Sequence, residues 1–325
     1  MMTVLTSVGF ALPPQVRVLD VSRDLLPVAD LIELCFNQTL DADGRRYLRQ
    51  MRAAGRSAHF LRWAAQVTEQ FALPMSGFVW QESGRIVGNV SLIPYFSWRR
   101  RVLMIANVAV DPTWRGRGIA RALTQAALQA VTRHKAEGWL QVRDDNPAAL
   151  HLYQSLGFTE QARRTTWYSQ PGWLTGRSPQ TGLTVVGRRR RDWQQQRAAL
   201  LQAYPLDLWW HFPIQLNWLQ PGLPGLWHSL WNGVLLRHWS AVQADGSWAG
   251  TLTLQPSYTY ADPLWAAVDP AGGNAALSAL LDYALTRYGH HRPLSLDYPH
   301  GEGNDVLRAL GFRLQHTLLW MRAAV

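Results

Sequence analysis

An internal repeat constrains the fold of this 325-residue chain more than any other feature. The run Ala109-Val110-Asp111-Pro112 recurs as Ala267-Val268-Asp269-Pro270, and Leu156-Gly157-Phe158 recurs as Leu310-Gly311-Phe312. In both copies a helical pattern follows the first run, then a short strand, then a second helix that ends at Leu-Gly-Phe. Two runs in the same order, joined by the same kinds of element, predict two tandem copies of one fold.

Strand and helix patterns alternate through the first copy, which favours an α/β fold. The strands are expected at 16–21, 77–82, 85–95, 100–110, 139–143, 158–162 and 165–169. The helices are expected at 25–36, 41–54, 57–69, 118–134 and 147–156, the first of them capped by Asp24. Ser83-Gly84 predicts a two-residue hairpin turn. In the second copy a strand at 184–188 and a helix at 192–203 repeat the opening of the first.

The boundary between the copies is expected at a stretch rich in Pro, Gly, Ser and Thr, PGWLTGRSPQTG at 171–182. The sequence therefore predicts a first domain at 1–172, a linker at 173–182 and a second domain at 183–325.

Composition excludes several classes of protein. A single cysteine, Cys35, rules out an internal disulfide and a multi-cysteine metal site, and no metal is expected. The sequence contains no apolar run near the length of a bilayer span, and its start lacks the basic region of a signal peptide, so we expect a soluble cytoplasmic protein with no membrane partner. The formal net charge is +10, with 20 basic and 13 acidic residues in 1–170. That surplus suits a polyanionic ligand.

The strongest chemical signal lies at 108–120, where a strand ends, a loop turns and a helix begins. The first N–H groups of a helix lack intrahelical partners and, with the helix dipole, favour an anion. Gly116 and Gly118 allow the backbone to approach a pyrophosphate closely. Three arginines, Arg115, Arg117 and Arg121, add positive charge.

This segment resembles the acyl-CoA loop of the GNAT acetyltransferases, which has Arg or Gln, two residues, Gly, one residue, then Gly or Ala. Here these positions are Arg115, Gly118 and Ala120. Downstream, the run from Asn146 through Tyr153 to Gly157-Phe158 resembles the second GNAT signature. The resemblance covers roughly residues 15–170 well and 180–325 weakly. A P-loop is excluded because Ile119, not lysine, follows Gly118.

The resemblance implies two tandem GNAT-type domains, each a mixed and partly splayed central sheet flanked by helices. It implies acetyl-CoA as cosubstrate, with its pyrophosphate against the backbone of Arg115, Gly116, Arg117, Gly118, Ile119 and Ala120, with Arg121 nearby. The strand Val108-Ala109-Val110 would hold the pantetheine arm, and an N–H near Val108 would polarise the thioester carbonyl. Tyr153 would be the general acid that protonates the leaving thiolate. Asn146 would either contact the cofactor or cap the helix that begins at Pro147.

The general base departs from the family pattern. Many GNAT members carry a carboxylate just before the Val-x-Val strand, but the matching positions here are Ala106 and Asn107. Asp144 and Asp145 are substitutes by position, although a solvated loop pair or a helix cap is the interpretation that the sequence favours for them. His59 and His151 are weaker candidates. A water chain, or an amine that arrives neutral, would need no dedicated base.

The second copy has lost the chemical residues. Gly273 stands at the position of Arg115, His300 at that of Asn146, and Leu307 at that of Tyr153. A leucine cannot donate a proton, so no catalysis is expected there, although 271–273 could form an anion nest.

These observations predict an N-acyltransferase that moves an acetyl group from acetyl-CoA to an amine by direct attack, with Cys35 a poor nucleophile. The acceptor is a small-molecule or peptide amine. The alternative is a non-catalytic acyl-CoA-binding or scaffold protein of GNAT fold. Seven large aromatics at 208–239 form either a packing block or a wall of the acceptor pocket. Nucleic acid is not expected, because Arg237 is the one basic residue among them. The oligomeric state is left open.

Overall fold

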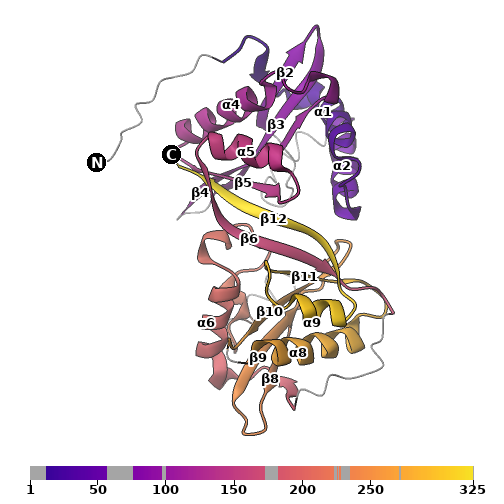
Figure 1. The fold of residues 1–325 in the computed structure, drawn as a ribbon, viewed down its shortest axis with the longest axis vertical. Helices are drawn as coiled ribbons and strands as arrows, with labels where there is room; N and C mark the ends of the chain where they lie inside the picture. Colours follow the sequence, from indigo (N-terminus) through magenta and orange to yellow (C-terminus); the bar gives the residue numbers. More distant parts are fainter. Residues whose placement is uncertain are drawn as a thin grey trace, which may run out of the picture. The chain divides into compact units, whose positions relative to one another are not determined.

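The computed structural model describes residues 12–56, 76–96, 100–172, 182–222, 225, 227, 235–270 and 272–324. The expected helix at 57–69 and nearly all of the expected linker lie outside these ranges. The chain forms two compact units (Figure 1). The first unit contains Met1–Gln141, Asn146–Thr159 and Met321–Val325, and the second contains Val142–Asp145 and Glu160–Trp320.

The first unit opens with two capped helices and an antiparallel meander. Its helices are α1 (Val21–Phe36), α2 (Ala42–Gly55), α4 (Ile119–Arg133) and α5 (Pro147–Ser155), with the short 3₁₀ turn η1 (Pro112–Trp114). Its strands are β1 (Val16–Val18), β2 (Ser76–Glu82), β3 (Arg85–Phe96), β4 (Arg101–Val110) and β5 (Glu137–Arg143), the last of which ends in the second unit. Their order is β1-β2-β3-β4-β5, antiparallel except for the parallel pair β4/β5.

Helices cover both faces of this sheet. On one face, a Cβ at Gly88 of β3 would lie 2.8 Å from Ile119 and 2.9 Å from Leu123, so glycine lets α4 approach the strand closely. On the other face, α1 and α2 bury an apolar cluster that includes Ala109 of β4. This two-sided burial fixes the end of β4 relative to the start of α4, where the predicted phosphate loop lies.

The second unit repeats the plan. Its helices are α6 (Trp193–Ala203), α8 (Gly273–Tyr288) and α9 (Asn304–Ala309), and its 3₁₀ turns are η2 (Arg190–Asp192), η3 (Leu206–Leu208) and η4 (Leu216–Leu219). Its strands are β6 (Phe158–Tyr168), β7 (Thr184–Gly187), β8 (Arg237–Val242), β9 (Trp248–Leu254), β10 (Asp262–Val268), β11 (Leu294–Pro299) and β12 (Arg313–Ala323). The order β11-β10-β9-β8-β7 mirrors the first unit, with β10/β11 as the parallel pair.

Neither compact unit is a single stretch of the chain. Residues 160–168 of β6 belong to the second unit, where Arg164–Tyr168 pair with Ser295–Pro299 of β11. Residues 321–325 belong to the first unit, where the N–H of Ala324 donates to the carbonyl of Gly157 at 3.2 Å. Each unit therefore includes a strand end from the other half of the sequence.

Most of the expected elements are confirmed, with two corrections. Helix α1 starts at Val21 and its cap is Asp20, whose carboxylate accepts from the Ser22 N–H at 3.0 Å. Asp24 is instead buried inside the first turn, paired with Arg17. The two strands expected at 158–162 and 165–169 are one continuous strand, β6. The hairpin turn is confirmed, since Ser83 and Gly84 both have positive φ.

The aromatic block at 208–239 is largely a packing feature of the second unit, and Trp231 lies outside the described residues. Phe212 is buried and meets Tyr204, Trp209 and Trp265 edge-on, at centroid distances of 5.3–5.8 Å. Such contacts add to the free energy of burial. Trp227 is an exception, with 66% of its surface exposed.

Candidate active site

The loop between β4 and α4 has the backbone that anion binding requires. Gly116 and Gly118 adopt positive φ, 78° and 76°, and Gly118 is the N-cap of α4. A Cβ built on either glycine would meet no atom within 4 Å, so this side of the loop is open. The first intrahelical bond runs from the Ala122 N–H to the Gly118 carbonyl, so the N–H groups of Ile119, Ala120 and Arg121 have no acceptor within the helix.

The three loop arginines are exposed, and each has a protein contact. Arg115 Nε donates to the Val110 carbonyl at 3.2 Å, and Arg117 lies 4.5 Å from the centroid of the Trp114 ring. Arg121 donates to Ser155 Oγ at 2.7 Å, which joins α4 to α5. Arginine offers five donors, so these contacts hold the guanidinium groups at the loop without using all their hydrogen-bonding capacity.

The parallel strands β4 and β5 separate where the sequence expects a gap. Their pairing runs from Val102↔Glu137 to Ile105↔Leu140 and does not extend to the last five residues of β4. The Asp111 N–H donates to Val87 on β3, so the preceding residue, Val110, directs its own N–H and C=O away from β3. Because Arg115 Nε already donates to the Val110 carbonyl, the Val110 N–H is the group that this end of β4 offers on its open edge, which fits the pantetheine interpretation.

A β-bulge shapes the same segment of β4. Asn89 of β3 faces Ala109 and Ser91 faces Ala106, so Asn107 and Val108 together oppose Val90. Asn107 takes the left-handed conformation, with φ 50°. The bulge turns the backbone just before the Val108 N–H, the group expected at the thioester carbonyl.

Buried polar side chains hold this bulge. Asn89 Nδ2 donates to the Asn107 carbonyl at 2.9 Å, and Asn107 Nδ2 donates to Tyr47 Oη at 2.9 Å and to Ser91 Oγ at 3.2 Å. Asn89 and Ser91 are fully buried, and Asn89 Oδ1 has no partner among the described residues. Burial raises the pKa of Tyr47 far above its usual range, so its hydroxyl stays neutral. The sequence pattern marks Asn107 only as a position without a carboxylate and does not reveal its role in the bulge. The available signal is an asparagine, a residue that tolerates positive φ, inside a strand pattern.

Helix α5 carries the other two predicted site residues. Asn146 is exposed and caps the helix, with Oδ1 accepting from the Ala149 N–H at 3.1 Å. Tyr153 is 7% exposed and meets Phe158 edge-on at 5.8 Å. Burial raises the pKa of Tyr153 to about 12, which keeps its hydroxyl protonated at neutral pH.

Comparison with known proteins identifies the family of this unit. The model of the Acetyltransferase (GNAT) family matches residues 40–158. The [Ribosomal protein bS18]-alanine N-acetyltransferase of Escherichia coli strain K12 is 43% identical over 63 residues, 19% of this chain and 43% of that protein. N-alpha-acetyltransferase RimI of Mycobacterium tuberculosis is 32% identical over 114 residues, 33% of this chain and 68% of that protein.

The chain belongs to the GNAT superfamily. Solved GNAT structures support the fold of both halves. A GCN5-related N-acetyltransferase from Sphaerobacter thermophilus matches with a TM-score of 0.57 at 15% identity, over 96% of each chain. A tandem GNAT protein from the clavulanic acid biosynthesis pathway matches with a TM-score of 0.50 at 17% identity, over 95% of this chain and 98% of that one. The chain spans less than half of the length of the bS18-alanine relatives that it matches.

The two carboxylates expected as substitute bases, Asp144 and Asp145, are exposed directly after β5. Asp145 is exposed and forms a bidentate pair with Arg143, at 2.7 and 2.9 Å. The hydrogen bonds from Arg143 lower the pKa of Asp145, which makes it a weaker base. His59 lies outside the described residues, and His151 is exposed on α5.

Cys35 lies near the loop but is poorly suited to attack. Its Sγ is 3.2 Å from the Val110 carbonyl, beside Arg115. Burial raises the pKa of the Cys35 thiol, and the Arg115 guanidinium only partly opposes this. A thiol that stays protonated is a weak nucleophile.

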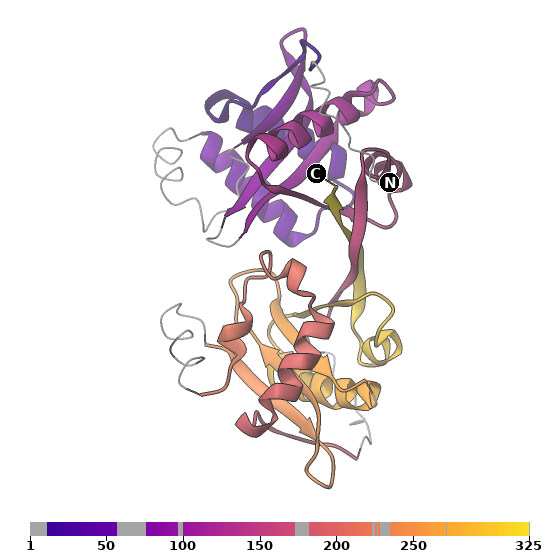
Figure 2. The ribbon, with the colours of Figure 1, turned by 90° about the vertical axis from the view of Figure 1, so that its left-hand side faces the viewer.

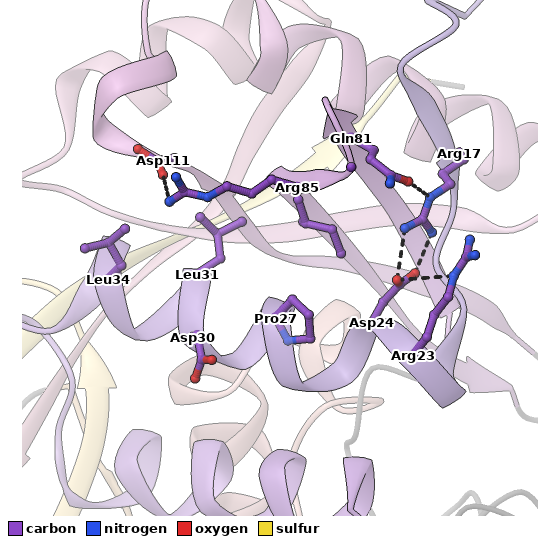
Figure 3. Close-up of a pocket in the computed structure, with 12 residues that line it drawn as sticks. Arg17, Arg23, Asp24, Pro27, Asp30, Leu31, Leu34, Gln81, Arg85 and Asp111 are labelled. Atoms are coloured by element: carbon purple, nitrogen blue, oxygen red, sulfur yellow. Dashed lines mark hydrogen bonds and ion pairs between the residues drawn. The ribbon is translucent and has the colours of Figure 1, made fainter.

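A separate cavity of about 490 Å³ lies between α1 and the strands β1–β3 of the GNAT unit (Figure 3). Its arginines are paired with carboxylates: Arg17 and Arg23 with Asp24, and Arg85 with Asp111. None of the predicted cofactor-binding residues lines it. Because its charges are internally neutralised, the β4–α4 loop is the better candidate for a polyanion.

Among the described residues, no helix combines the length and the apolarity that crossing a membrane would require.

Proposed function

We propose that this protein is an N-acetyltransferase that transfers the acetyl group of acetyl-CoA to an amine, and that the first unit performs the transfer. The observation that carries the proposal is the open β4–α4 loop beside the gap between β4 and β5. A pyrophosphate fits the loop, which combines two glycines with open space beside them, a helix N-terminus and three arginines. An extended arm that carries amide groups fits the edge of β4 that is not paired with β5. The RimI relative of Mycobacterium tuberculosis, an N-alpha-acetyltransferase by name, supports the choice of an amine as acceptor.

Each residue of the site then has a specific task. The backbone of Arg115 to Ala120 holds the phosphates, with Arg117 and Arg121 supplying charge, and Val108, Ala109 and Val110 align the pantetheine arm. The Val108 N–H, set by the bulge, donates to the thioester carbonyl as negative charge develops there. Asn146 acts by capping the helix that carries Tyr153.

Acetyl-CoA supplies the acetyl group as a thioester. In the transfer a carbon–nitrogen bond forms to the acceptor as the carbon–sulfur bond breaks, and Tyr153 gives its proton to the departing sulfur. A neutral hydroxyl with a raised pKa is available as a donor throughout the neutral range. The proton of the amine passes to solvent water and the Tyr153 oxygen regains a proton from solvent, so that the products are the acetylated amine and the free thiol of CoA.

The proposal is tested by incubating the full chain with acetyl-CoA and a panel of amines, from N-terminal peptides to small polyamines, and measuring free CoA together with the mass of the acceptor. Amine-dependent CoA release with a product heavier by one acetyl group supports it. Release without a modified amine contradicts it.

The alternative, a non-catalytic acyl-CoA-binding protein, is favoured by one observation. Ala106 and Asn107 occupy the positions where many GNAT members carry a carboxylate, and Asn107 is committed to holding the bulge. Such a protein would bind acetyl-CoA in the same test and release no CoA with any amine.

A further inference from the structure

The second unit contains a cleft of its own, with a volume of about 660 Å³. It lies where β10 and β11 separate, beyond the last parallel pair Leu264↔Leu296, and between α6 and the start of α8. Ala203, Val268 and Leu277 give it an apolar wall. The gap is therefore open, although the residues expected for acyl transfer are replaced in this copy.

One end of the cleft presents backbone donors. Gly273, Asn274 and Ala275 open α8, a helix of 16 residues that has no side-chain cap. The first intrahelical bond of α8 runs from the Ala276 N–H to the Gly272 carbonyl, so the three preceding N–H groups have no acceptor within the helix. These groups favour a negatively charged or strongly polar ligand atom.

A buried tyrosine places a hydroxyl that has no protein partner among the described residues at the same cleft. Tyr298 of β11 lines the cleft with only 2% of its surface exposed, and no hydrogen bond within the described part of the chain reaches its hydroxyl. Burial, followed by the nearby Glu302 carboxylate, raises the pKa of Tyr298 to about 12, so the hydroxyl remains a donor. The hydroxyl can therefore donate a hydrogen bond to a ligand acceptor in the cleft.

The charge of the cleft differs from that of the β4–α4 loop. Glu302 is the one charged side chain among the described residues that line it, and none of them is basic. Where the first unit has Arg115, the second has Gly273. Glu302 would repel a polyanion such as the nucleotide part of CoA, and no arginine would compensate. A ligand with one carboxylate next to one ammonium group fits better, because the first N–H groups of α8 match the carboxylate and Glu302 matches the ammonium.

We propose that this second cleft binds a free aliphatic α-amino acid. Its carboxylate accepts from the first N–H groups of α8 and from Tyr298, its ammonium lies beside Glu302, and its side chain packs on Ala203, Val268 and Leu277. The inference does not depend on acyl transfer by the first unit.

The test is calorimetry on the full chain with L-leucine and two analogues that each lack one charged group. L-Leucine is expected to bind saturably at one site per chain. L-Leucinamide, without the carboxylate, and 4-methylpentanoate, without the ammonium, are each expected to bind about tenfold more weakly or worse, since each leaves polar groups of the cleft unpaired.

Three variants assign the site. Tyr298→Phe removes one hydrogen bond and is expected to weaken L-leucine binding by about fivefold. Glu302→Gln, an exposed change that keeps the shape of the side chain, is expected to erase the preference for L-leucine over 4-methylpentanoate. Asp305→Asn is the matched control, because it removes a neighbouring negative charge that does not line the cleft, and its affinity is expected to equal that of the parent.

Two results would overturn the proposal. One is the absence of saturable L-leucine binding to a folded parent chain. The other is competition between acetyl-CoA and L-leucine, which would place CoA in the second cleft. A chain that binds L-leucine but acetylates no amine would contradict only the proposed function, so the two failures are distinguishable.

Discussion

At the scale of single residues, Asn107 links the fold of β4 to the chemistry expected at Val108. Its backbone takes a left-handed conformation that β-branched residues avoid, and its amide bridges Tyr47 of α2 to Ser91 of β3. The sequence identifies this position as lacking a carboxylate, but the bulge depends on a strand register that periodicity alone does not reveal.

Two substitutions at Asn107 separate backbone strain from hydrogen bonding. Asn107→Gly loses the side-chain amide but tolerates the positive φ. Asn107→Ala loses the amide and is strained at positive φ, so its free energy of unfolding is expected to be about 1 kcal/mol lower than that of the glycine variant. Denaturant titration of both variants measures the difference. Equal stabilities would show that the bulge does not constrain the backbone at this residue.

Asn146 offers a test between its two expected roles. The structure shows a helix cap, and loss of an N-cap costs about 1 kcal/mol of stability. Asn146→Asp keeps the capping oxygen and is expected to match the parent in both stability and acetyl-CoA affinity. Asn146→Ala is expected to lower the melting temperature. A large loss of acetyl-CoA affinity in the aspartate variant would show instead that the amide contacts the cofactor.

At the scale of elements, the β4–loop–α4 unit is the part that sequence predicts best. Strand end, glycine loop and helix start all fall within a residue or two of their expected places, because glycine spacing and apolar periodicity are local signals. The start of α1 is predicted wrongly, because the pattern favours Asp24 as the cap, whereas Asp20 caps the helix and Asp24 is buried in the first turn with Arg17.

Gly118 tests the loop directly. A side chain there meets no protein atom but extends over the open face where the pyrophosphate is expected. Gly118→Ala is expected to cost about 1 kcal/mol of stability because of the positive φ, and Gly118→Trp is expected to abolish acetyl-CoA binding as well. Gly157→Trp is a matched control, with positive φ and open space at a different turn. Calorimetry that finds the parent affinity in Gly118→Trp would remove the loop from the site.

At the scale of the whole molecule, the repeat predicts two copies of one fold but not which strand ends join which unit. Apolar patterns in β6 and β12 specify strands without naming their partners, and the structure assigns 160–168 to the second unit and 321–325 to the first. The second cleft was equally beyond the sequence, because the loss of arginines and of the tyrosine said nothing about whether the gap between β10 and β11 is open.

Removing residues 321–325 tests this arrangement. These residues contribute the Ala324–Gly157 hydrogen bond and an Arg322 guanidinium that lies 5.8 Å from the centroid of the Trp139 ring in the first unit. The shortened chain is expected to unfold at a lower temperature and to bind acetyl-CoA more weakly. Arg322→Ala, which keeps the strand, is expected to lower the melting temperature much less. Unchanged melting of the shortened chain would show that the end of β12 does not stabilise the first unit.

We propose that the first unit transfers an acetyl group with Tyr153 as the acid. The most direct measurement compares Tyr153→Phe with the parent, following acetyl-CoA affinity by calorimetry and amine-dependent CoA release under saturating acetyl-CoA. Because the ring is kept and only the hydroxyl is lost, we expect unchanged acetyl-CoA affinity and a rate of CoA release lower by about 10²–10⁴-fold. Equal rates in the two proteins would contradict it.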